Sequence, residues 1–152
     1  MLERKSIKSI NRKRVYDLLR ESQSLSKQDI SYKLKLSLPT VTQNLNELQE
    51  LKLIEDKGVF GYTGGRNARA YSIISDARIA IGLDITKNHI TTVAVNLNGE
   101  VMESNRIRYV FSFSDDYFKK LGSLVNEIIN KICIEEEKIM GVGTSSTYYR
   151  GS

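Results

Sequence analysis

The alternation of apolar and polar positions predicts two short helices in succession between residues 26 and 48. Ile30 and Leu34 lie four residues apart and would share one face of the first helix. Ser26 suits the N-cap of that helix, and Asp29 three residues later is a weaker form of the capping-box partner. The apolar spacing is lost at residues 36–37, which predicts a tight turn there.

Pro39 is expected to begin the second helix. Its missing N–H costs nothing at the first helical position, and its ring disfavours helical geometry at the residue before it. The apolar residues that follow recur at helical spacing and form one stripe. They are Val41, Leu45 and Leu48. The positions that point away from the stripe are uncharged and rich in hydrogen-bond donors and acceptors. They are Pro39, Gln43 and Asn46, with Thr40 and Thr42 on the flanks.

That outward face favours DNA as its partner. A recognition helix in a major groove needs short polar side chains that reach base edges. A helix that faces only water would more often carry Glu and Lys. An ordinary amphipathic helix pair in a small helical domain is the alternative, and the two helices alone do not decide between the readings.

A hairpin rich in glycine is expected after the second helix. Residues 51–55 and 68–73 would form its strands, and four glycines fall within eight positions at 58–65. Arg66 and Arg69 flank the tip, where an arginine can enter the narrow minor groove or bind phosphate. A flexible surface hairpin that binds nothing is the alternative.

A helix is also expected from residue 11 to residue 21, with Val15, Leu18 and Leu19 on its inner side. Ile7 and Ile10 could extend that face, and a mobile basic lead is expected over residues 1–9. Basic residues cluster at the start of this helix, where the helix dipole disfavours cations. Phosphate contact by this cluster would offset that cost. A basic turn that is simply solvated explains the same residues.

The second half of the chain predicts the order β-β-β-α-β. Strands are expected at residues 80–85, 90–97 and 100–110, with Asn98-Gly99 as a hairpin turn, and a last strand begins at residues 139–143. Asp115 or Asp116 would cap the helix between them. Its apolar positions follow helical spacing: Tyr117, Leu121, Leu124, Ile128 and Ile132.

The composition of the chain limits the classes of partner and site that it can have. The 152 residues carry a net charge of +5, but residues 1–75 hold 14 Lys and Arg against 8 Asp and Glu, whereas residues 76–152 hold 9 against 10. A basic first half suggests a polyanionic partner. The single Cys133 and the single His89 predict no disulfide and no metal site, and they fit a cytoplasmic protein. No apolar run approaches the roughly 20 residues that cross a bilayer, so no membrane partner is expected.

Several motifs resemble the winged-helix head of ROK regulators, the repressor, open reading frame and kinase family. They are Asn11-Arg12, the run Leu-Ser-Lys-Gln-Asp-Ile at 25–30, the run Leu-Pro-Thr-Val-Thr at 38–42, and Gly64-Gly65-Arg66. The branch they resemble is that of the N-acetylglucosamine and xylose repressors. Asn67 departs from the family, in which Pro or Lys usually follows this arginine.

The order of strands and helix in the second half resembles the start of the actin-like sugar-kinase fold on which ROK proteins are built. The expected fold is therefore α+β, with a winged helix-turn-helix domain at 1–75 and a partial ROK domain at 76–152. Kinase members carry Asp-Ile-Gly-Gly-Thr after the first strand, whereas this chain has Asp-Ile-Thr-Lys-Asn at 84–88. Because glycines let the backbone approach the phosphates of ATP, neither nucleotide binding nor catalysis is expected.

Family members continue for some 200 further residues, a length typical of a two-lobed domain. By resemblance, that portion holds the sugar pocket, the zinc motif and the catalytic aspartate. The residues after Gly143 no longer follow the family pattern. The chain is therefore expected to be a truncated regulator with a complete DNA-binding head. Its strand edges, such as residues 81–83 and 93–95, would need a partner or invite aggregation.

The leading hypothesis is a sequence-specific repressor of carbohydrate genes that acts on double-stranded operator DNA. Base contacts are expected from Thr40, Thr42, Gln43 and Asn46, and Pro39 beside them is expected to belong to the same DNA-binding face. Phosphate or groove contacts are expected from Arg12, Arg14, Lys27, Arg66, Asn67 and Arg69. The resemblance implies a homodimer on near-palindromic sites, and a sugar effector in the full-length parent only. A winged-helix module that binds proteins, or a fragment of a ROK sugar kinase, is the alternative.

Overall fold

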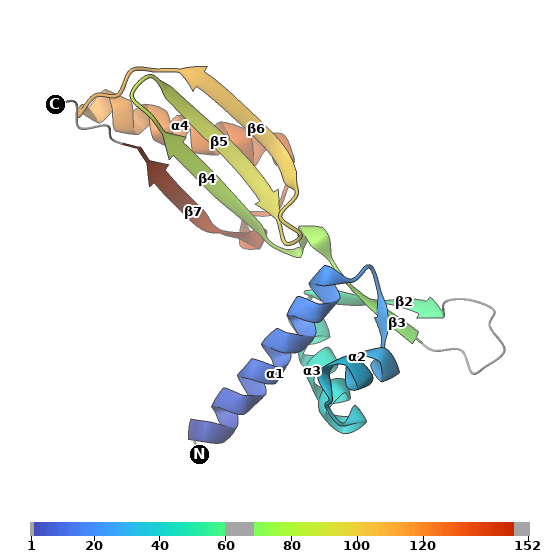
Figure 1. The fold of residues 1–152 in the computed structure, drawn as a ribbon. Helices are drawn as coiled ribbons and strands as arrows, with labels where there is room; N and C mark the ends of the chain where they lie inside the picture. Colours follow the sequence, from blue (N-terminus) through green and yellow to red (C-terminus); the bar gives the residue numbers. More distant parts are fainter. Residues whose placement is uncertain (1, 60–68, 148–152) are drawn as a thin grey trace. The chain divides into compact units, whose positions relative to one another are not determined.

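The computed structural model describes residues 2–59 and 69–147, and their side chains at 7–58 and 69–147. The chain divides into two compact units, Met1–Ser75 and Asp76–Ser152 (Figure 1). Each unit combines helices with a sheet of its own. The predicted α+β class is therefore confirmed.

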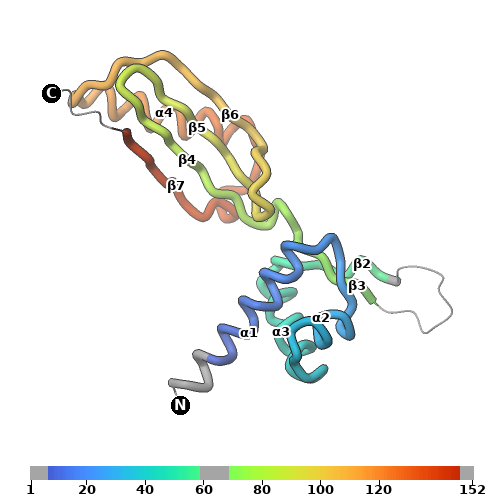
Figure 2. Tube along the Cα trace, viewed as in Figure 1, coloured from blue at the N-terminus to red at the C-terminus, as the bar shows by residue number. Residues whose placement is uncertain are grey.

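The first unit contains three helices and a small antiparallel sheet with strand order β1-β3-β2. The helices are α1 (Leu2–Glu21), α2 (Lys27–Leu34) and α3 (Leu38–Glu50). The strands are β1 (Leu25–Ser26), β2 (Ile54–Val59) and β3 (Arg69–Ile73). A short turn joins α2 to α3 (Figure 2).

One apolar core holds the elements of the first unit together. It includes Val15 and Leu19 of α1, which the sequence placed on the inner side of that helix. The other buried members come from both later helices and from the sheet. They are Ile30, Val41, Leu45, Leu48, Ile54 and Tyr71.

Three expectations for the first unit were wrong. Helix α1 begins at Leu2 rather than at residue 11, so residues 2–9 are helical and not a mobile lead. Strand β2 begins at Ile54 rather than at residue 51, because the Leu51 N–H still donates to the Glu47 carbonyl at 3.1 Å and continues the helical turn. The two-residue strand β1 was not foreseen, since so short a strand exists only through its pairing with β3.

The second unit is a four-stranded sheet with α4 packed on one face (Figure 1). Its strands are β4 (Ile79–Ile85), β5 (His89–Asn96), β6 (Val101–Arg108) and β7 (Ile139–Ser146), and its helix is α4 (Asp115–Ile132). Single-turn 3-10 helices lie at Ser75–Ala77 and Glu136–Lys138. The strand order is β6-β5-β4-β7, with β7 parallel to β4 and the other pairs antiparallel. This agrees with the predicted order β-β-β-α-β.

Two apolar clusters fill the space between α4 and the sheet. The buried members are Ile79, Ile81, Leu83, Ile90, Ala94, Tyr117, Leu124 and Ile128. The helix cap differs from the expectation. Ser114, not Asp115 or Asp116, is the N-cap, because its Oγ accepts a hydrogen bond from the Tyr117 N–H at 3.3 Å. The two aspartates occupy the first turn, where negative charge complements the helix dipole.

The expected strand edges were also wrong. Residues 81–83 lie in β4 and residues 93–95 in β5, and both are inner strands of the sheet. Within residues 69–147 the two outer strands are β6 and β7 instead, since β6 pairs with β5. The reason is topological, because β7 returns after α4 and inserts beside β4.

Candidate nucleic-acid interface

A capping box fixes the start of α2, as the sequence predicted. The Asp29 N–H donates to Ser26 Oγ at 3.1 Å, and the Ser26 N–H donates to Asp29 Oδ2 at 3.1 Å. Hydrogen bonds from the Ser26 side chain and then its backbone lower the pKa of Asp29, because they favour the charged carboxylate. Lys27 is thereby held in the first turn of α2. Its Nζ lies 5.7 Å from the centroid of the Tyr71 ring, at cation–π distance.

The turn between α2 and α3 is held by its own hydrogen bonds. Lys35 adopts a left-handed conformation with φ 54° and ends α2. The Leu36 N–H donates to the Ser31 carbonyl at 3.2 Å, and Ser31 Oγ donates to the Leu36 carbonyl at 2.6 Å. Ser37 then caps α3, since its Oγ accepts from the Thr40 N–H at 3.4 Å and lies 2.8 Å from Thr40 Oγ1. These bonds set the orientation of α3.

Helix α3 separates buried from exposed positions as its spacing predicted. Val41, Leu45 and Leu48 are buried in the core. The predicted DNA-contacting residues of α3 divide into two classes by exposure. Pro39, Gln43 and Asn46 are exposed, and Thr40 and Thr42 are half-buried. Contact of these five side chains with DNA stays a prediction.

The sequence reasoning missed Asn44, which is 2% exposed on the inner side of α3. Its Nδ2 donates to the Thr40 carbonyl at 2.7 Å, whereas its Oδ1 is buried and has no hydrogen-bond partner among the described residues. Its burial could have been predicted from the sequence, because Asn44 lies three residues after Val41 and next to Leu45, beside the apolar stripe.

Arg12 lies against α3 and has a partner within the chain. Its Nη1 lies 3.2 Å from Glu47 Oε2, and Lys8 Nζ lies 2.5 Å from Glu47 Oε1. The Lys8 hydrogen bond, followed by the charges of Lys8 and Arg12, lowers the pKa of Glu47 against the opposing effect of desolvation. The sequence offered no sign of this cluster, because its members lie on different helices. A phosphate contact by Arg12 stays a prediction.

Arg14 and Arg69 also make contacts within the first unit. Arg14 Nη2 donates to the Leu34 carbonyl at 3.1 Å and so joins α1 to the end of α2. Arg69 Nη1 lies 3.3 Å from Asp56 Oδ2, yet the Arg69 side chain is 73% exposed. Arg66 and Asn67, the other predicted residues of the hairpin tip, lie outside the described residues.

Three exposed residues near α3 were not singled out from the sequence. Tyr32 and Lys33 lie on the outer side of α2, and Lys35 lies in the turn before α3. Tyr32 is 86% exposed, which is unusual for so large a ring. Their exposure could have been predicted from the sequence, because none of the three shares the apolar stripe of Ile30 and Leu34.

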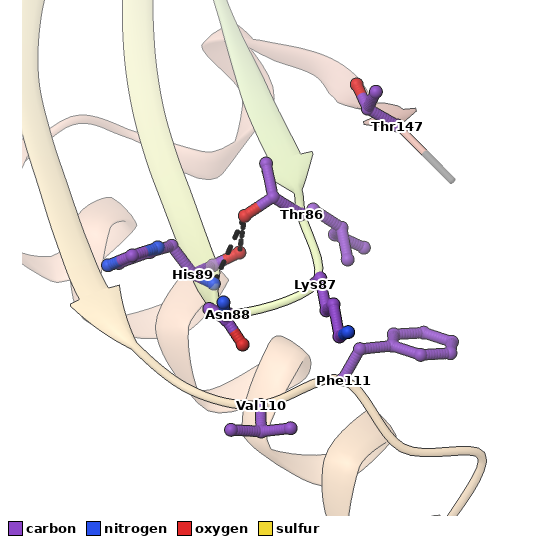
Figure 3. Close-up of a pocket in the computed structure, with 8 residues that line it drawn as sticks. Thr86, Lys87, Asn88, His89, Val110, Phe111 and Thr147 are labelled. Atoms are coloured by element: carbon purple, nitrogen blue, oxygen red, sulfur yellow. Dashed lines mark hydrogen bonds between the residues drawn. The ribbon is translucent and has the colours of Figure 1, made fainter. Parts of the chain in front are cut away.

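The second unit has a pocket of about 500 Å³ at the turn between β4 and β5. Figure 3 shows Thr86 and His89 joined across this turn, with Val110 and Phe111 on the segment that follows β6. The lining residues are Ile85, Thr86, Lys87, Asn88, His89, Val110, Phe111 and Thr147. The pocket includes Thr86, Lys87 and Asn88 of the turn, which contains no glycine.

Hydrogen bonds of its own backbone hold the turn beside this pocket. The Thr86 N–H donates to the His89 carbonyl at 3.0 Å, and Thr86 Oγ1 accepts from the His89 N–H at 3.1 Å. The carbonyl of Lys87 accepts from the Phe111 N–H at 2.9 Å. A phosphate cradle needs free N–H groups that converge on the anion. Two N–H groups of this turn are thus bonded within it, and the absence of phosphate binding stays a prediction.

Within residues 2–59 and 69–147, no group of three or more His, Cys, Asp or Glu residues is placed to hold a metal ion. Cys133 is exposed and free. None of the described helices is both long enough and apolar enough to span a membrane.

Comparison with known proteins supports the resemblance seen in the motifs. No family model matches the chain. A protein of Caldicellulosiruptor sp. (strain Rt8B.4) named "Putative xylose repressor" is 25% identical over 138 residues, which cover 90% of this chain and 35% of that protein.

The crystal structure of a ROK family transcriptional regulator, a homologue of the E. coli MLC protein, has the same fold with a TM-score of 0.68. It is 21% identical, and the match covers 92% of this chain and 36% of that one. The chain thus spans about a third of the length of both proteins. The two matches confirm the predicted resemblance to ROK repressors.

Proposed function

We propose, from this resemblance to ROK repressors, that the first unit is a winged helix-turn-helix head that binds specific sequences of double-stranded DNA. In this proposal α3 is the recognition helix, and the hairpin of β2 and β3 is the wing. The target genes are proposed to serve carbohydrate metabolism, with xylose the sugar that the name of one relative suggests. A DNA-binding role also places the protein in the cytoplasm.

The observation that carries the proposal is the outer face of α3. Its exposed positions Pro39, Gln43 and Asn46 carry no charge and offer amide donors and acceptors. Gln and Asn can form paired hydrogen bonds with the edge of adenine in the major groove. The capped turn before α3 and the buried stripe beneath it hold this face in place, and a fixed helix is what base recognition requires.

The cations of the first unit are proposed to contact phosphates on either side of the groove. Lys27 lies in the first turn of α2, where backbone N–H groups also favour anions. Arg12 and Arg14 have partners on α3 and α2. We therefore assign them a second role, which is to fix α1 against the two helices. Arg69 at the base of the wing has a side chain that is 73% exposed, which leaves it accessible to a phosphate.

The second unit is proposed to lack catalysis and to represent part of the regulatory domain of the family. The turn of residues 86–89 supports this, because the N–H groups of Thr86 and His89 are bonded within the turn and the carbonyls of Lys87 and Asn88 accept hydrogen bonds from the segment after β6. Sugar binding belongs in this proposal to the longer family members. A homodimer on a near-palindromic operator is proposed for the DNA complex.

A protein-binding module is the second candidate, and two exposed side chains favour it. Tyr32 is 86% exposed and Leu38 is 46% exposed, one on α2 and one at the start of α3. Large exposed apolar groups close together can mark a protein interface. The basic charge of residues 1–75 favours DNA over this candidate.

Binding to a pool of random duplex DNA at two salt concentrations, followed by sequencing of the bound fraction, tests the proposal. A sequence-specific head enriches a motif, and its affinity falls with salt because bound phosphates release counterions. Salt-sensitive binding without any enriched motif would contradict specificity. No binding at low salt would favour the protein-binding module.

A further inference from the structure

The ring of Tyr71 lies beside the first residue of α2. Lys27 Nζ is 5.7 Å from the centroid of that ring, and Lys27 itself is half-buried. Tyr71 is 4% exposed and belongs to the apolar core of the first unit. Side chains in a packed core keep one arrangement on average. The ring is therefore the fixed partner of this contact, and the lysine is the partner whose position it can determine.

Strand pairing sets where this ring lies. Tyr71 of β3 pairs with Leu25 of β1 on one side and with Asp56 of β2 on the other. Leu25 is followed by the N-cap Ser26 and then by Lys27, so the pairing of β1 with β3 brings the first turn of α2 to the ring. The contact thus joins the return strand of the proposed wing to α2.

The dipole of α2 opposes a cation at this place. Lys27 is the first residue of the helix, and the partial positive charge of a helix N-terminus repels an ammonium group. The negative face of an aromatic ring attracts the same group. Tyr71 therefore holds a cation that its own helix does not hold, at a helix end whose N–H groups favour an anion.

The partner of Lys27 also differs from those of other cations in the first unit. The cations that lie at ion-pair distance from a carboxylate are Lys8, Arg12, Lys13, Lys57 and Arg69. Among the residues that the structure describes, Lys27 has a ring and no carboxylate as its partner. A carboxylate competes with an incoming phosphate for the charge of a cation, whereas a ring has no net charge. Lys27 is held in place and still able to bind a phosphate.

We propose that Tyr71 is a positioning residue for DNA binding, which holds the Lys27 ammonium ready for a phosphate of the DNA backbone. A lysine side chain that is free in solution loses rotational freedom when it binds, which lowers affinity. A ring that already orders this side chain in the free protein removes part of that loss. The inference rests on the proposed function, since it needs DNA as the partner.

A cycle of substitutions separates positioning from packing. Tyr71→Leu removes the ring, so affinity for the site selected from random duplex DNA should fall by about two- to five-fold. The slope of log affinity against log salt should fall toward that of Lys27→Ala. In a Lys27→Ala background, Tyr71→Leu should leave the affinity unchanged, because the ring then has no ammonium group to hold. Tyr71→Phe keeps the ring and should bind with the affinity and salt slope of the wild type.

Ile73→Ala is the matched control, because Ile73 lies on the same strand and packs against the same core. Any loss of affinity that it causes should be equal with and without Lys27. An equal loss from Tyr71→Leu in both backgrounds would overturn the inference and leave the proposed function standing, because a packing defect does not depend on Lys27. A wild type that binds no DNA at low salt would overturn the proposed function and the inference with it.

Nuclear magnetic resonance of the wild type without DNA gives a reading that does not depend on whether Tyr71→Leu folds. Protons that lie over the face of an aromatic ring resonate upfield because of the ring current. The ε protons of Lys27 should show this shift, whereas those of Lys131, which pairs with Glu103 instead, should not. Lys27 ε protons that resonate where those of a free lysine do would overturn the inference.

Discussion

Helices α3 and α4 are both amphipathic, yet they present different surfaces. Each packs an apolar stripe into the core of its unit. The exposed side of α4 carries charges that pair nearby, as between Lys119 and Asp116 at 3.7 Å and between Lys131 and Glu103 of β6 at 3.7 Å. The exposed side of α3 carries Gln43 and Asn46 instead, and its exposed charge, Glu50, lies at the last residue of the helix.

This contrast indicates whether the exposed face of a helix is suited to water alone or to DNA. Charged pairs keep α4 solvated and contribute little to stability at exposed positions. Amides on α3 also bind water when exposed, but their donors and acceptors match those on base edges. We therefore assign solvent to the exposed face of α4 and propose DNA for that of α3. Substitutions at matched positions can separate the two roles.

Truncating a buried leucine or isoleucine should have the largest effect on stability. The effect on DNA binding should differ between the two units. Leu45 of α3 and Ile128 of α4 are 0% and 1% exposed. Leu45→Ala and Ile128→Ala should each lower the free energy of unfolding by about 2–5 kcal/mol through lost burial and a cavity. Chemical denaturation measures this, and only Leu45→Ala should also weaken DNA binding. Equal loss of DNA binding in both variants would contradict the division of roles.

Gln43→Ala should relax base preference at one position of the binding site, with a loss of about 1–3 kcal/mol there and little change elsewhere. The exposed Lys119 of α4 supplies the control, and Lys119→Ala should leave the preference unchanged. Competition binding with single-base variants of the selected site measures both. Loss of affinity that is equal on all sequences would argue against base reading by Gln43.

Lys27→Ala should weaken binding to all sequences together. If Lys27 contacts one phosphate, the slope of log affinity against log salt should fall by about one unit. Lys131→Ala on α4 should leave that slope unchanged. A change of sequence preference in Lys27→Ala, with the slope unaltered, would place this lysine at a base rather than at the backbone.

The smallest effect concerns the contact between α1 and α3. Lys8 and Arg12 lower the pKa of Glu47, so this ion pair stabilises the fold above the unfolded pKa of about 4.3. That stabilisation is lost as the pH falls through the lower folded pKa. Glu47→Gln should cost about 1 kcal/mol or less at pH 7. The difference from wild type should shrink in acid, which denaturation at several pH values tests. A difference that does not change with pH would exclude the ion pair as its cause.

Local signals predicted most of the helices. The capping box at Ser26, the break before Pro39 and the stripe of α3 are read from neighbouring residues, and the structure has α2 and α3 where they predicted. The first turns of α1 were missed because Ile7 and Ile10 are more than half exposed there, so no buried stripe marks them. The prediction of the sheet edges was wrong because the order of the strands depends on where β7 pairs, and no local pattern in the sequence indicates this.

The candidate site was predictable only where it rests on one helix. The exposure of Gln43 and Asn46 follows from the period of α3. The partners of Arg12 and Arg14 do not, because each lies on another helix, 35 and 20 residues away along the chain. Sequence reasoning therefore saw these arginines as free cations, whereas the structure shows them joining helices.

The most direct test of the account compares the wild type with a Gln43→Ala/Asn46→Ala double variant in selection from random duplex DNA. The account predicts that the wild type enriches a defined motif. The double variant should still bind DNA at low salt through its cations but should enrich no motif or a degenerate one. Enrichment of the same motif by both proteins would show that another part of the molecule reads the sequence, and it would contradict the role assigned to α3.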